Sequence, residues 1–439
     1  MPNASITCLR DALAGAAGGE LVDRDKRIKL ADAPFAVDVS AATGRSVLLT
    51  TKGQFESALA LIALDGLARK IVICPPDLSE DRKRIIATRT GTDCEVSQAT
   101  TAATDRSLKT PSSTDWILLT SGTSGVPKTV RHTLATLTAA IKPSAVPASG
   151  IVWSTFYDIR RYGGLQILLR AILGGHSLVL SSADEPMAAF LVRAGANGVT
   201  HLTGTPSHWR SALMSQAITA ISPRYIRLSG EIADQAVLDA LKAAFPKAKI
   251  VHAYASTEAG VGFEVDDGRE GFPASLVQPA QMGFELRVTG GALHIRSDGA
   301  ARAYVGDGEA PLLDADGFAD TGDMVERRGE RYFFAGRRGG IINVGGAKVH
   351  PEEVEAVINP VPGVRVSQVR AKANPIVGAI VVADVVAADV APAADRTALR
   401  EAIVAACRTQ LAEYKVPVII RFVTDLPLSP TGKLIRNGS

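Results

Sequence analysis

Short apolar runs alternate with helical patterns along the first 120 residues of the chain. The runs Ser46–Thr50 and Lys70–Cys74 have the length of buried strands, and Phe55–Leu67 between them places apolar residues at helical spacing. A third run, Trp116–Thr120, has the same character. Parallel strands need a crossover of about a dozen residues or more, which is usually a helix. The pattern therefore predicts βαβ units and a parallel sheet covered by helices.

The α/β alternation continues to about residue 255, after which the pattern changes. The pattern predicts a helix at Leu165–Leu173 and a strand at Ser177–Leu180. It then predicts a helix at Ala233–Ala244 and a strand at Lys249–Ala253, which precedes Tyr254. Residues 283–335 instead contain short apolar runs separated by Gly and Asp. These runs predict small antiparallel strands at Phe284–Val288, Ala292–Ile295 and Arg331–Phe334.

A glycine-rich segment, Gly336–Gly340, separates this part of the chain from a tail with its own pattern. Because glycine permits large backbone changes, the segment is a candidate boundary. The tail predicts a helix from Pro351, a strand Ala379–Val386, a helix Arg396–Leu411 with Asp395 as N-cap, and a strand Val418–Val423. The fold class is therefore α/β. Residues 1–338 are expected to form a large domain of parallel-type sheets, helices and a small antiparallel part, and residues 339–439 a small α+β domain.

Composition narrows the class of protein. Apolar residues make up 46% of the 439 residues and charged residues 21%, as in an ordinary globular chain that can bury a large core. The net charge is only +3 and no long basic block stands out, which argues against nucleic acid as a partner. The four cysteines form no CxxC pair, so neither a zinc site nor a disulfide framework is expected. The start of the chain is not typical of a signal peptide, and no apolar stretch reaches about 18 residues. A cytoplasmic protein without a membrane span is expected.

The strongest chemical signal is the segment Thr120–Lys128, TSGTSGVPK, which follows a predicted strand. Backbone N–H groups of such a loop can surround phosphate oxygens, and glycine allows their close approach. The phosphate-binding candidates are its hydroxyl residues, its glycines and the closing lysine: Thr120, Ser121, Gly122, Thr123, Ser124, Gly125 and Lys128. The Walker pattern GxxxxGKS/T does not apply, because Pro127 stands where that pattern needs glycine.

This segment resembles the phosphate loop of the adenylate-forming (ANL) superfamily, which includes AMP-dependent acyl-CoA synthetases, peptide-synthetase adenylation domains and firefly-type luciferases. Further segments resemble motifs of that superfamily and occur in its order: His252–Glu258, Asp320–Asp323, Gly336 to Glu355, and Pro430–Lys433. Ser124, Thr129 and Ala255 depart mildly from the usual residues. The chain is identified as a short member of the superfamily, and its phosphate loop comes early enough to suggest a trimmed N-terminal region.

The resemblance implies the chemistry of the nucleotide site. A carboxylate attacks the α-phosphorus of ATP and pyrophosphate leaves, so charge on the phosphate oxygens must be stabilised. Glu258, helped by Thr257, would hold Mg²⁺, for which oxygen ligands are suited. Tyr254 would stack on adenine, Asp323 would accept hydrogen bonds from the ribose hydroxyls, and Arg337 would also contact the nucleotide.

The resemblance also implies that one site carries out two half-reactions. The C-terminal domain first delivers Lys433, which bridges the carboxylate and the phosphate, and then rotates to form the thioester site. The hinge position is Gly339, where the superfamily usually has Asp or Lys, and glycine should make this hinge looser. Gly345 and Gly346 correspond to the glycine loop that lines the thiol channel.

A pocket for the acid is expected beside these motifs. The resemblance places along it Tyr157, Arg161, Gly164, Ser229, Gly230, Ala259 and Gly260. The usual histidine before the pocket helix is absent, and Asp158, Arg160 and Arg161 occur there instead. An arginine that faces the pocket can pair with an additional carboxylate or phenolate of the substrate; alternatively, it points to solvent or pairs with Asp158. We expect a small, polar or aromatic acid rather than a long acyl chain.

These inferences predict an ATP-dependent ligase that forms an acyl-adenylate and transfers the acyl group to a thiol. Coenzyme A is the expected acceptor, and the phosphopantetheine arm of an acyl carrier protein is the alternative. A kinase or NTPase is disfavoured by Pro127 and by the C-terminal TGK motif. A non-catalytic nucleotide-binding protein on the same fold is disfavoured because Lys128, Glu258, Asp323 and Lys433 are retained.

Overall fold

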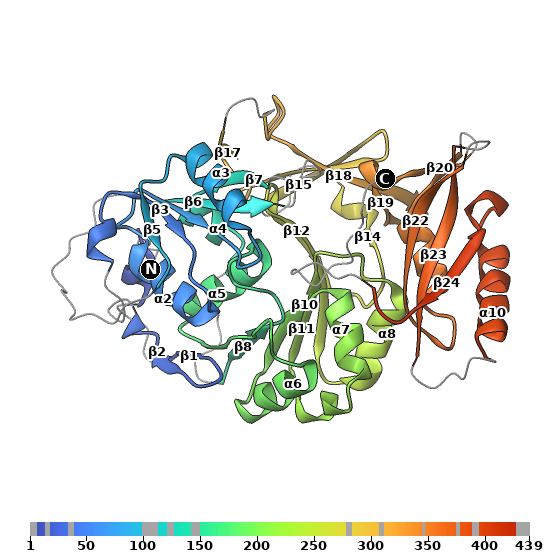
Figure 1. Cartoon of the computed structure of the whole chain (residues 1–439), viewed down its shortest axis with the longest axis horizontal. Helices are drawn as coiled ribbons and strands as arrows, with labels where there is room; N and C mark the ends of the chain where they lie inside the picture. The colour runs from blue at the N-terminus through green and yellow to red at the C-terminus, as the bar shows by residue number, and fades with distance from the viewer. Residues whose placement is uncertain are drawn as a thin grey trace.

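The computed structural model describes residues 7–13, 18–33, 39–98, 113–120, 127–141, 150–277, 283–306, 311–344, 347–374, 378–388 and 395–426. Within these residues the chain forms four sheets, which we call the N-terminal, central, antiparallel and C-terminal sheets. The ribbon runs from the N-terminal sheet on the left of Figure 1 to the C-terminal sheet on the right.

The N-terminal sheet has six strands in the order β17 (Ala303–Tyr304), β7 (Lys128–His132), β6 (Asp115–Thr120), β4 (Lys70–Ile73), β3 (Ser46–Leu49) and β5 (Cys94–Val96). Strands β3 to β6 are parallel, whereas β7 and β17 add an antiparallel edge. Along β3, Val47 and Leu49 pack on the side of α2 (Gln54–Leu64) and Leu48 on the side of α3 (Glu80–Thr90). Burial on both faces explains why these strands are uninterrupted apolar runs.

The central sheet has eight strands in the order β13 (Gly260–Val265), β12 (Lys249–Ser256), β11 (Tyr225–Ser229), β10 (His201–Gly204), β8 (Val152–Thr155), β9 (Ser177–Val179), β1 (Glu20–Val22) and β2 (Arg27–Lys29). The six strands from β12 to β1 are parallel, and β13 and β2 close the edges in antiparallel fashion. The carboxyl ends of β8, β10, β11 and β12 therefore meet at one edge, where α/β sheets usually bind ligands.

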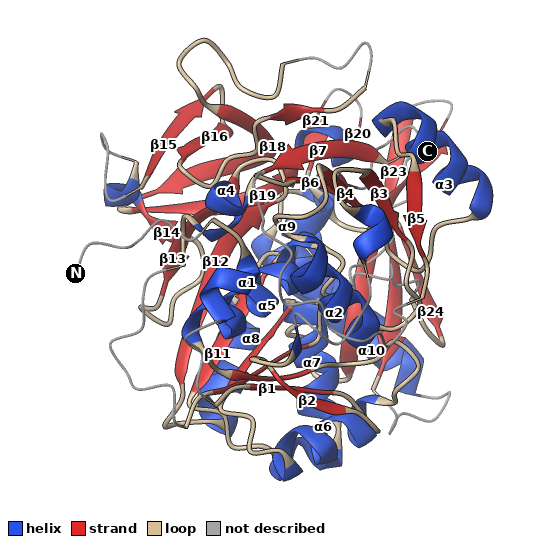
Figure 2. Cartoon of the chain, turned by 90° about the vertical axis from the view of Figure 1, so that its left-hand side faces the viewer, coloured by secondary structure: helices blue, strands red, loops and turns tan. Residues whose placement is uncertain are grey.

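Helices fill the space between these two sheets and cover their outer faces. The largest core joins both sheets through α2, α1 (Leu9–Leu13), α4 (Leu134–Thr138) and α5 (Tyr162–Gly174). Figure 2 shows α1, α2 and α5 at the centre of the molecule, with strands around them. The opposite face of the central sheet packs on α6 (Met187–Ala196), α7 (Pro206–Met214) and α8 (Gln235–Ala244). Two helix-covered sheets are thus stacked through shared helices.

The antiparallel sheet consists of β14 (Phe272–Pro273), β19 (Arg331–Arg337), β18 (Ala319–Arg328), β16 (Ala292–Ser297) and β15 (Phe284–Thr289). Its pairings are all antiparallel, as predicted for residues 283–335. Its core includes Phe263 and Val265 of β13, which attach this sheet to the edge of the central sheet.

The C-terminal sheet contains β20 (Ile342–Val344), β21 (Ala347–Val349), β22 (Val364–Asn374), β23 (Gly378–Ala387) and β24 (Ile419–Val423), with α9 (Pro351–Ile358) and α10 (Asp395–Gln410). A separate core of residues from Ile342 to Ile420 holds these elements together. In Figure 1, α10 lies on the outer side of this sheet. A core of its own supports the predicted division near residue 338, which stays a prediction.

The predicted α/β fold class is confirmed, and the element positions agree within a few residues. Two expectations were wrong. Strand β12 extends to Ser256, so Tyr254 lies inside the strand and does not follow it. A register shift between Tyr254 and Ala255 interrupts the pairing with β13. Asp395 is the first residue of α10 and not the residue before it. Among the described helices, none has both the length and the apolar character that crossing a bilayer requires.

Candidate active site

The two ends of the predicted phosphate loop are held by a hairpin. Thr120 ends β6 and Lys128 begins β7, and the two residues are partners in the antiparallel register. Lys128 Nζ lies 4.6 Å from the centre of the Tyr304 ring, within cation–π range. The loop residues Ser121, Gly122, Thr123, Ser124 and Gly125 lie outside the described residues. The hairpin therefore fixes where the loop starts and ends.

The turn Thr257–Ala259, which carries the predicted metal ligand Glu258, joins the ends of β12 and β13. His132 Nε2 from β7 donates to the Thr257 carbonyl at 2.7 Å, so the hairpin supports the turn directly. Burial lowers the pKa of His132 to about 4, which keeps the imidazole neutral at pH 7. Sequence reasoning missed His132, although its position four residues after Lys128 was visible.

The other side of this turn is held by the segment that follows β16. The Ala301 amide donates to the Glu258 carbonyl at 2.9 Å, and Ser297 Oγ donates to the Ala259 carbonyl at 2.7 Å. These bonds use the backbone carbonyls of Glu258 and Ala259 and not the Glu258 carboxylate. The side chain therefore does not provide the structural support of the turn.

The donors at the turn fit Mg²⁺ as implied by the superfamily. Glu258 offers carboxylate oxygens and Thr257 a hydroxyl, which are hard ligands. No cluster of three metal-binding side chains occurs in the part of the chain that the structure describes. Mg²⁺ commonly binds through one or two carboxylates together with substrate phosphates, so this sparse donor set is compatible with that ion.

Three predicted nucleotide-binding residues come together on neighbouring strands. The Tyr254 hydroxyl donates to Asp323 Oδ2 at 2.5 Å, and Arg337 Nε donates to Asp323 Oδ1 at 2.9 Å. Asp323 lies on β18 directly opposite Arg337 on β19. The Asp323 carboxylate raises the pKa of Arg337, and the nearby Glu258 charge acts in the same direction. Glu258 thus belongs to the same electrostatic environment.

The Tyr254 ring is fixed by aromatic neighbours. It is nearly parallel to Phe263 and to Phe334, with centroid distances of 5.7 and 5.6 Å. Burial raises the pKa of the Tyr254 hydroxyl, and the Asp323 charge raises it further, so the group stays a hydrogen-bond donor. A carboxylate has about four acceptor positions, and Asp323 therefore retains acceptor capacity beyond these two contacts.

The predicted hinge follows this cluster immediately. Arg338–Gly340 form a short 3-10 helix after β19, and Arg338 pairs with Asp320 at 2.9 Å. Around Gly339, no described atom lies within 4 Å of the position that a Cβ would occupy. The hinge is thus tied to β18 at its start and unobstructed at its glycine.

The predicted acid-pocket residues lie at the carboxyl ends of the central strands. Tyr157 follows β8, and its hydroxyl donates to the carbonyl of Ser229 at the end of β11, at 2.6 Å. Gly230 follows β11, while Ala259 is buried in the turn before β13. Gly260 has a φ of +75°, which favours glycine.

Gly164 occupies a position where the helix passes very close to the preceding loop. A Cβ at this residue would lie 2.3 Å from the Asp158 carbonyl oxygen. That contact explains the glycine at position 164, although α5 is a buried helix.

The arginines of this segment are paired with protein carboxylates. Arg160 is 4% exposed, pairs with Asp158 at 2.6 Å and donates to the carbonyls of Thr51 and Lys52. Arg161 Nη2 pairs with Asp77 at 2.7 Å. Of the alternatives considered for these arginines, pairing with Asp158 therefore applies to Arg160.

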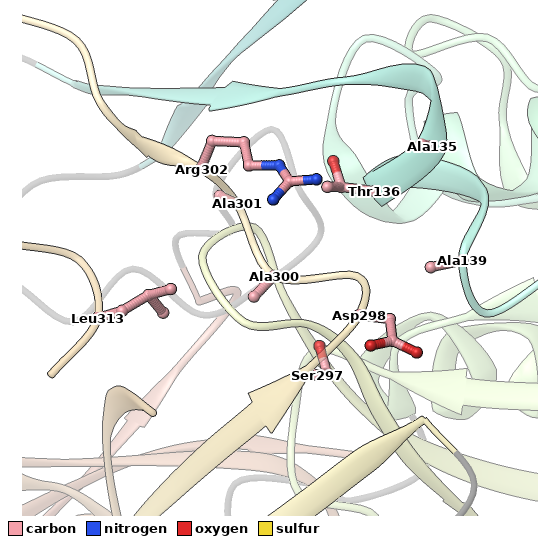
Figure 3. A pocket seen from close by; sticks show the side chains of 9 residues that line it. All are labelled: Ala135, Thr136, Ala139, Ser297, Asp298, Ala300, Ala301, Arg302 and Leu313. Carbon is pink, nitrogen blue, oxygen red and sulfur yellow. The ribbon is translucent and has the colours of Figure 1, made fainter. Parts of the chain in front are cut away.

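A pocket of about 490 Å³ is lined in part by residues 297–302, the segment that supports the turn Thr257–Ala259. Figure 3 shows its lining, in which the short side chains of α4 face the segment 297–302. Asp298 and Arg302 are its charged residues. The described lining includes none of the site residues predicted from the sequence. Lys433, Gly345 and Gly346 lie outside the described residues.

Comparison with known proteins assigns the class. The family model of AMP-binding enzymes matches residues 37–305, and the model of the C-terminal domain of AMP-binding enzymes matches residues 353–433. The chain belongs to the AMP-binding enzyme family, within the adenylate-forming superfamily.

Two curated relatives illustrate this membership. Fatty acid–acyl-carrier-protein ligase MmaC of Mycobacterium marinum is 27% identical over 359 residues, which are 73% of this chain and 66% of the relative. Medium/long-chain fatty acid–acyl-carrier-protein ligase FadD10 of Mycobacterium tuberculosis is 27% identical over 352 residues, which are 73% of this chain and 65% of the relative. The chain thus spans just under two thirds of the length of both relatives.

The fold also matches solved structures. The o-succinylbenzoate CoA synthetase MenE of Bacillus subtilis, in complex with its acyl-adenylate intermediate, superposes with a TM-score of 0.74 at 17% identity. The match covers 98% of this chain and 97% of that chain. At this identity the likeness concerns the fold.

Proposed function

We propose that this protein activates a carboxylic acid with ATP and then transfers the acyl group to a thiol. A carboxylate oxygen attacks the α-phosphorus, the bond to the bridging oxygen breaks, and pyrophosphate leaves with the electron pair. A thiol sulfur then attacks the acyl carbon, and AMP leaves. The observation that carries the proposal is the Asp323 carboxylate, held between Tyr254 and Arg337 within the environment of Glu258.

Each group of this site has a defined part in the first step. Asp323 accepts hydrogen bonds from the ribose, while Arg337 keeps that carboxylate oriented. Lys128, held at the base of the phosphate loop, and Lys433 supply positive charge to the phosphates and the acid. Thr257 and Glu258 would hold Mg²⁺, which supplies charge neutralisation at the phosphates.

Coenzyme A is the proposed acceptor, and an acyl carrier protein is the second candidate. The second candidate gains support from the names of the two relatives, which are acyl-carrier-protein ligases. An assay that supplies each acceptor after adenylation separates the two candidates. Only with the true acceptor should thioester form and AMP be released in equal amounts.

Carboxylate-dependent exchange between ATP and pyrophosphate tests the proposal. The panel holds short, branched, hydroxy, dicarboxylic, aryl and long-chain acids, and the control omits the acid. Acid-dependent exchange with AMP as product supports the proposal. ADP as product would indicate kinase chemistry, and ATP binding without exchange for any acid would indicate a non-catalytic nucleotide-binding protein.

A further inference from the structure

One face of the central sheet carries an arginine where a buried strand usually carries an apolar residue. Along β11, Ile226 and Leu228 belong to the core formed with α6, α7 and α8. Because side chains alternate along a strand, Tyr225, Arg227 and Ser229 lie on the opposite face, which α5 covers. Arg227 is 4% exposed, so its guanidinium is removed from water.

A second arginine approaches the same place from α5. Arg170 Nη2 lies 4.0 Å from Glu264 Oε1, and Arg227 Nε lies 3.1 Å from that same oxygen. The side chain of Arg170 is 19% exposed and that of Glu264, on the edge strand β13, is 40% exposed. Two guanidiniums, of which Arg227 is the more deeply buried, therefore share one carboxylate on a partly exposed side chain.

This cluster has one acidic group for two guanidiniums, and some of its N–H groups have no acceptor among the described residues. Nη2 of Arg227 and Nε of Arg170 are buried and have no hydrogen-bond partner among the described residues. Burial lowers the pKa of Arg170, and the neighbouring Arg227 charge lowers it further. A buried N–H group without an acceptor is costly, and one carboxylate can balance the charge of only one of the two guanidiniums.

The cluster lies between the same two elements, α5 and β11, that carry residues of the predicted acid pocket. Ser229 is two residues beyond Arg227 on the same strand face, and Gly163 is seven residues before Arg170, two turns along one helix face. Tyr157 spans the gap at the pocket: a Cβ at Gly163 would contact its ring at 3.4 Å, and its hydroxyl bonds to the Ser229 carbonyl. Further from the strand ends, Arg170 of α5 and Arg227 of β11 both reach Glu264 of β13.

We propose that Arg227 and Arg170 form an anion subsite at the inner end of the acid pocket, and that the preferred substrate is an acid with a second, oxyanionic group. The subsite rests on the proposed function. The reacting carboxylate lies at the carboxyl ends of the strands, beside Glu258. The second carboxylate, or an equivalent oxyanion, accepts hydrogen bonds from the two guanidiniums.

The arginines that the sequence suggested for this role are less suitable. Arg160 and Arg161 already face Asp158 and Asp77 at hydrogen-bond distance, so their charges are compensated within the protein. Arg227 and Arg170 differ because the only acidic group within ion-pair distance in the described chain is shared between them.

Exchange kinetics with matched acid pairs test the subsite. Each pair consists of a dicarboxylic acid and its monomethyl ester, over a series of chain lengths and one aryl series, so that only the second charge differs. The wild-type kcat/KM should favour the diacid at one spacing. Arg227→Leu should reduce that preference by roughly 10- to 100-fold, through KM, because a charge-assisted hydrogen bond is lost.

Two further variants guard against loss of folding as an explanation. Glu264→Gln should shift the preference in the opposite direction, towards the diacid, because the competing carboxylate is removed. Arg227→Lys retains the charge and should keep part of the preference. The matched control is Arg210→Leu on α7, whose arginine pairs with Asp234 on the other face of the sheet and is 21% exposed. This control should leave the preference unchanged.

The outcomes separate the two proposals. Equal kcat/KM for diacids and esters at every spacing, or a preference that Arg227→Leu and Glu264→Gln leave unchanged, overturns the subsite alone. Absence of exchange with every acid overturns the proposed function, and the subsite falls with it. A preference that falls in Arg227→Leu and rises in Glu264→Gln establishes the subsite.

Discussion

At the scale of single residues, Asp323 is the group on which nucleotide binding is expected to depend most. Its two oxygens are engaged by Tyr254 and Arg337, and these contacts orient the remaining lone pairs. Asp323→Asn should raise the KM for ATP by roughly 10- to 100-fold, because hydrogen bonds to a charged acceptor contribute about 1.5–3 kcal/mol. Steady-state kinetics at saturating acid measure this change.

The matched control for Asp323 is Asp320 on the same strand. Asp320 pairs with Arg338 and is 46% exposed on its side chain. Asp320→Asn should leave the KM for ATP within about two-fold, since exposed ion pairs contribute little. Equal effects of the two substitutions would show that Asp323 has no special part in nucleotide binding.

The sequence motifs predicted Tyr254, Asp323 and Arg337 as separate nucleotide-binding residues. That they contact one another became visible only from the strand pairing in the structure. His132 and Arg227 were missed for different reasons. His132 supports the turn Thr257–Ala259 through a hydrogen bond to a backbone carbonyl, and a pattern of side chains in the sequence does not reveal such a bond. The signal for Arg227 was present, because the alternation of Tyr225, Arg227 and Ser229 with apolar residues places a charge on a buried strand face.

At the scale of elements, the start of α5 depends on a close backbone approach. Gly164→Ala would place a Cβ 2.3 Å from the Asp158 carbonyl oxygen, and backbone atoms cannot yield as a flexible side chain can. We expect the free energy of unfolding to fall by about 1–3 kcal/mol, as for an overpacked core site. Urea denaturation measures this change, and the exchange assay reports the displaced pocket loop.

Gly163→Ala provides the comparison at the adjacent helix position. Its Cβ would meet the Tyr157 ring at 3.4 Å, which is an ordinary contact. Because alanine is the better helix former by about 1 kcal/mol, this variant should be as stable as the wild type or more stable. A Gly164→Ala protein that matches Gly163→Ala in stability would refute the close-approach argument.

The sequence predicted this helix only from Leu165 onwards, whereas α5 begins at Tyr162. The two glycines are typical of a loop when read locally. The structure places both in the first turn of α5, and the loop carbonyl of Asp158 leaves no room for a side chain at Gly164. Glycine here serves packing between segments, which local propensity does not describe.

At the scale of the whole molecule, the two half-reactions are expected to need different positions of the C-terminal domain. Lys433→Ala should reduce adenylation by at least about 100-fold, because a positioned cation at the transition state is lost. Thioester formation from supplied acyl-adenylate should stay within about two-fold. The exchange assay measures adenylation, and an assay with pre-formed acyl-adenylate measures thioester formation. An equal fall in both rates would contradict the domain-rotation mechanism.

The pH dependence of the free energy of unfolding is also a property of the whole molecule. Burial lowers the pKa of His132 and of His208 to about 4. Their unfolded pKa is about 6.5, so the unfolded chain binds more protons below that value. Their contribution to stability is present above pH 6.5 and is lost as the pH falls towards 4. Burial raises the pKa of Asp65 to about 6, which acts in the opposite sense below pH 6.

We therefore expect the free energy of unfolding to fall between pH 7.5 and pH 5. Replacing His208 by Gln should reduce that fall by roughly 2 kcal/mol, which follows from a shift of this size at pH 5. Urea unfolding of both proteins at the two pH values provides the measurement. An identical pH dependence would mean that His208 is not buried as a neutral group.

The sequence by itself determined the α/β alternation and the order of the motifs, and it predicted the nature of the nucleotide site. Apolar periodicity and motif spacing are local properties, legible in short windows of the chain. Only the tertiary structure decided that Asp323 lies between Tyr254 and Arg337, that Arg160 and Arg161 are already paired, and that Arg170 and Arg227 share one carboxylate. Electrostatic and desolvation energies depend on distances between side chains from separate strands and helices, and folding alone fixes those distances.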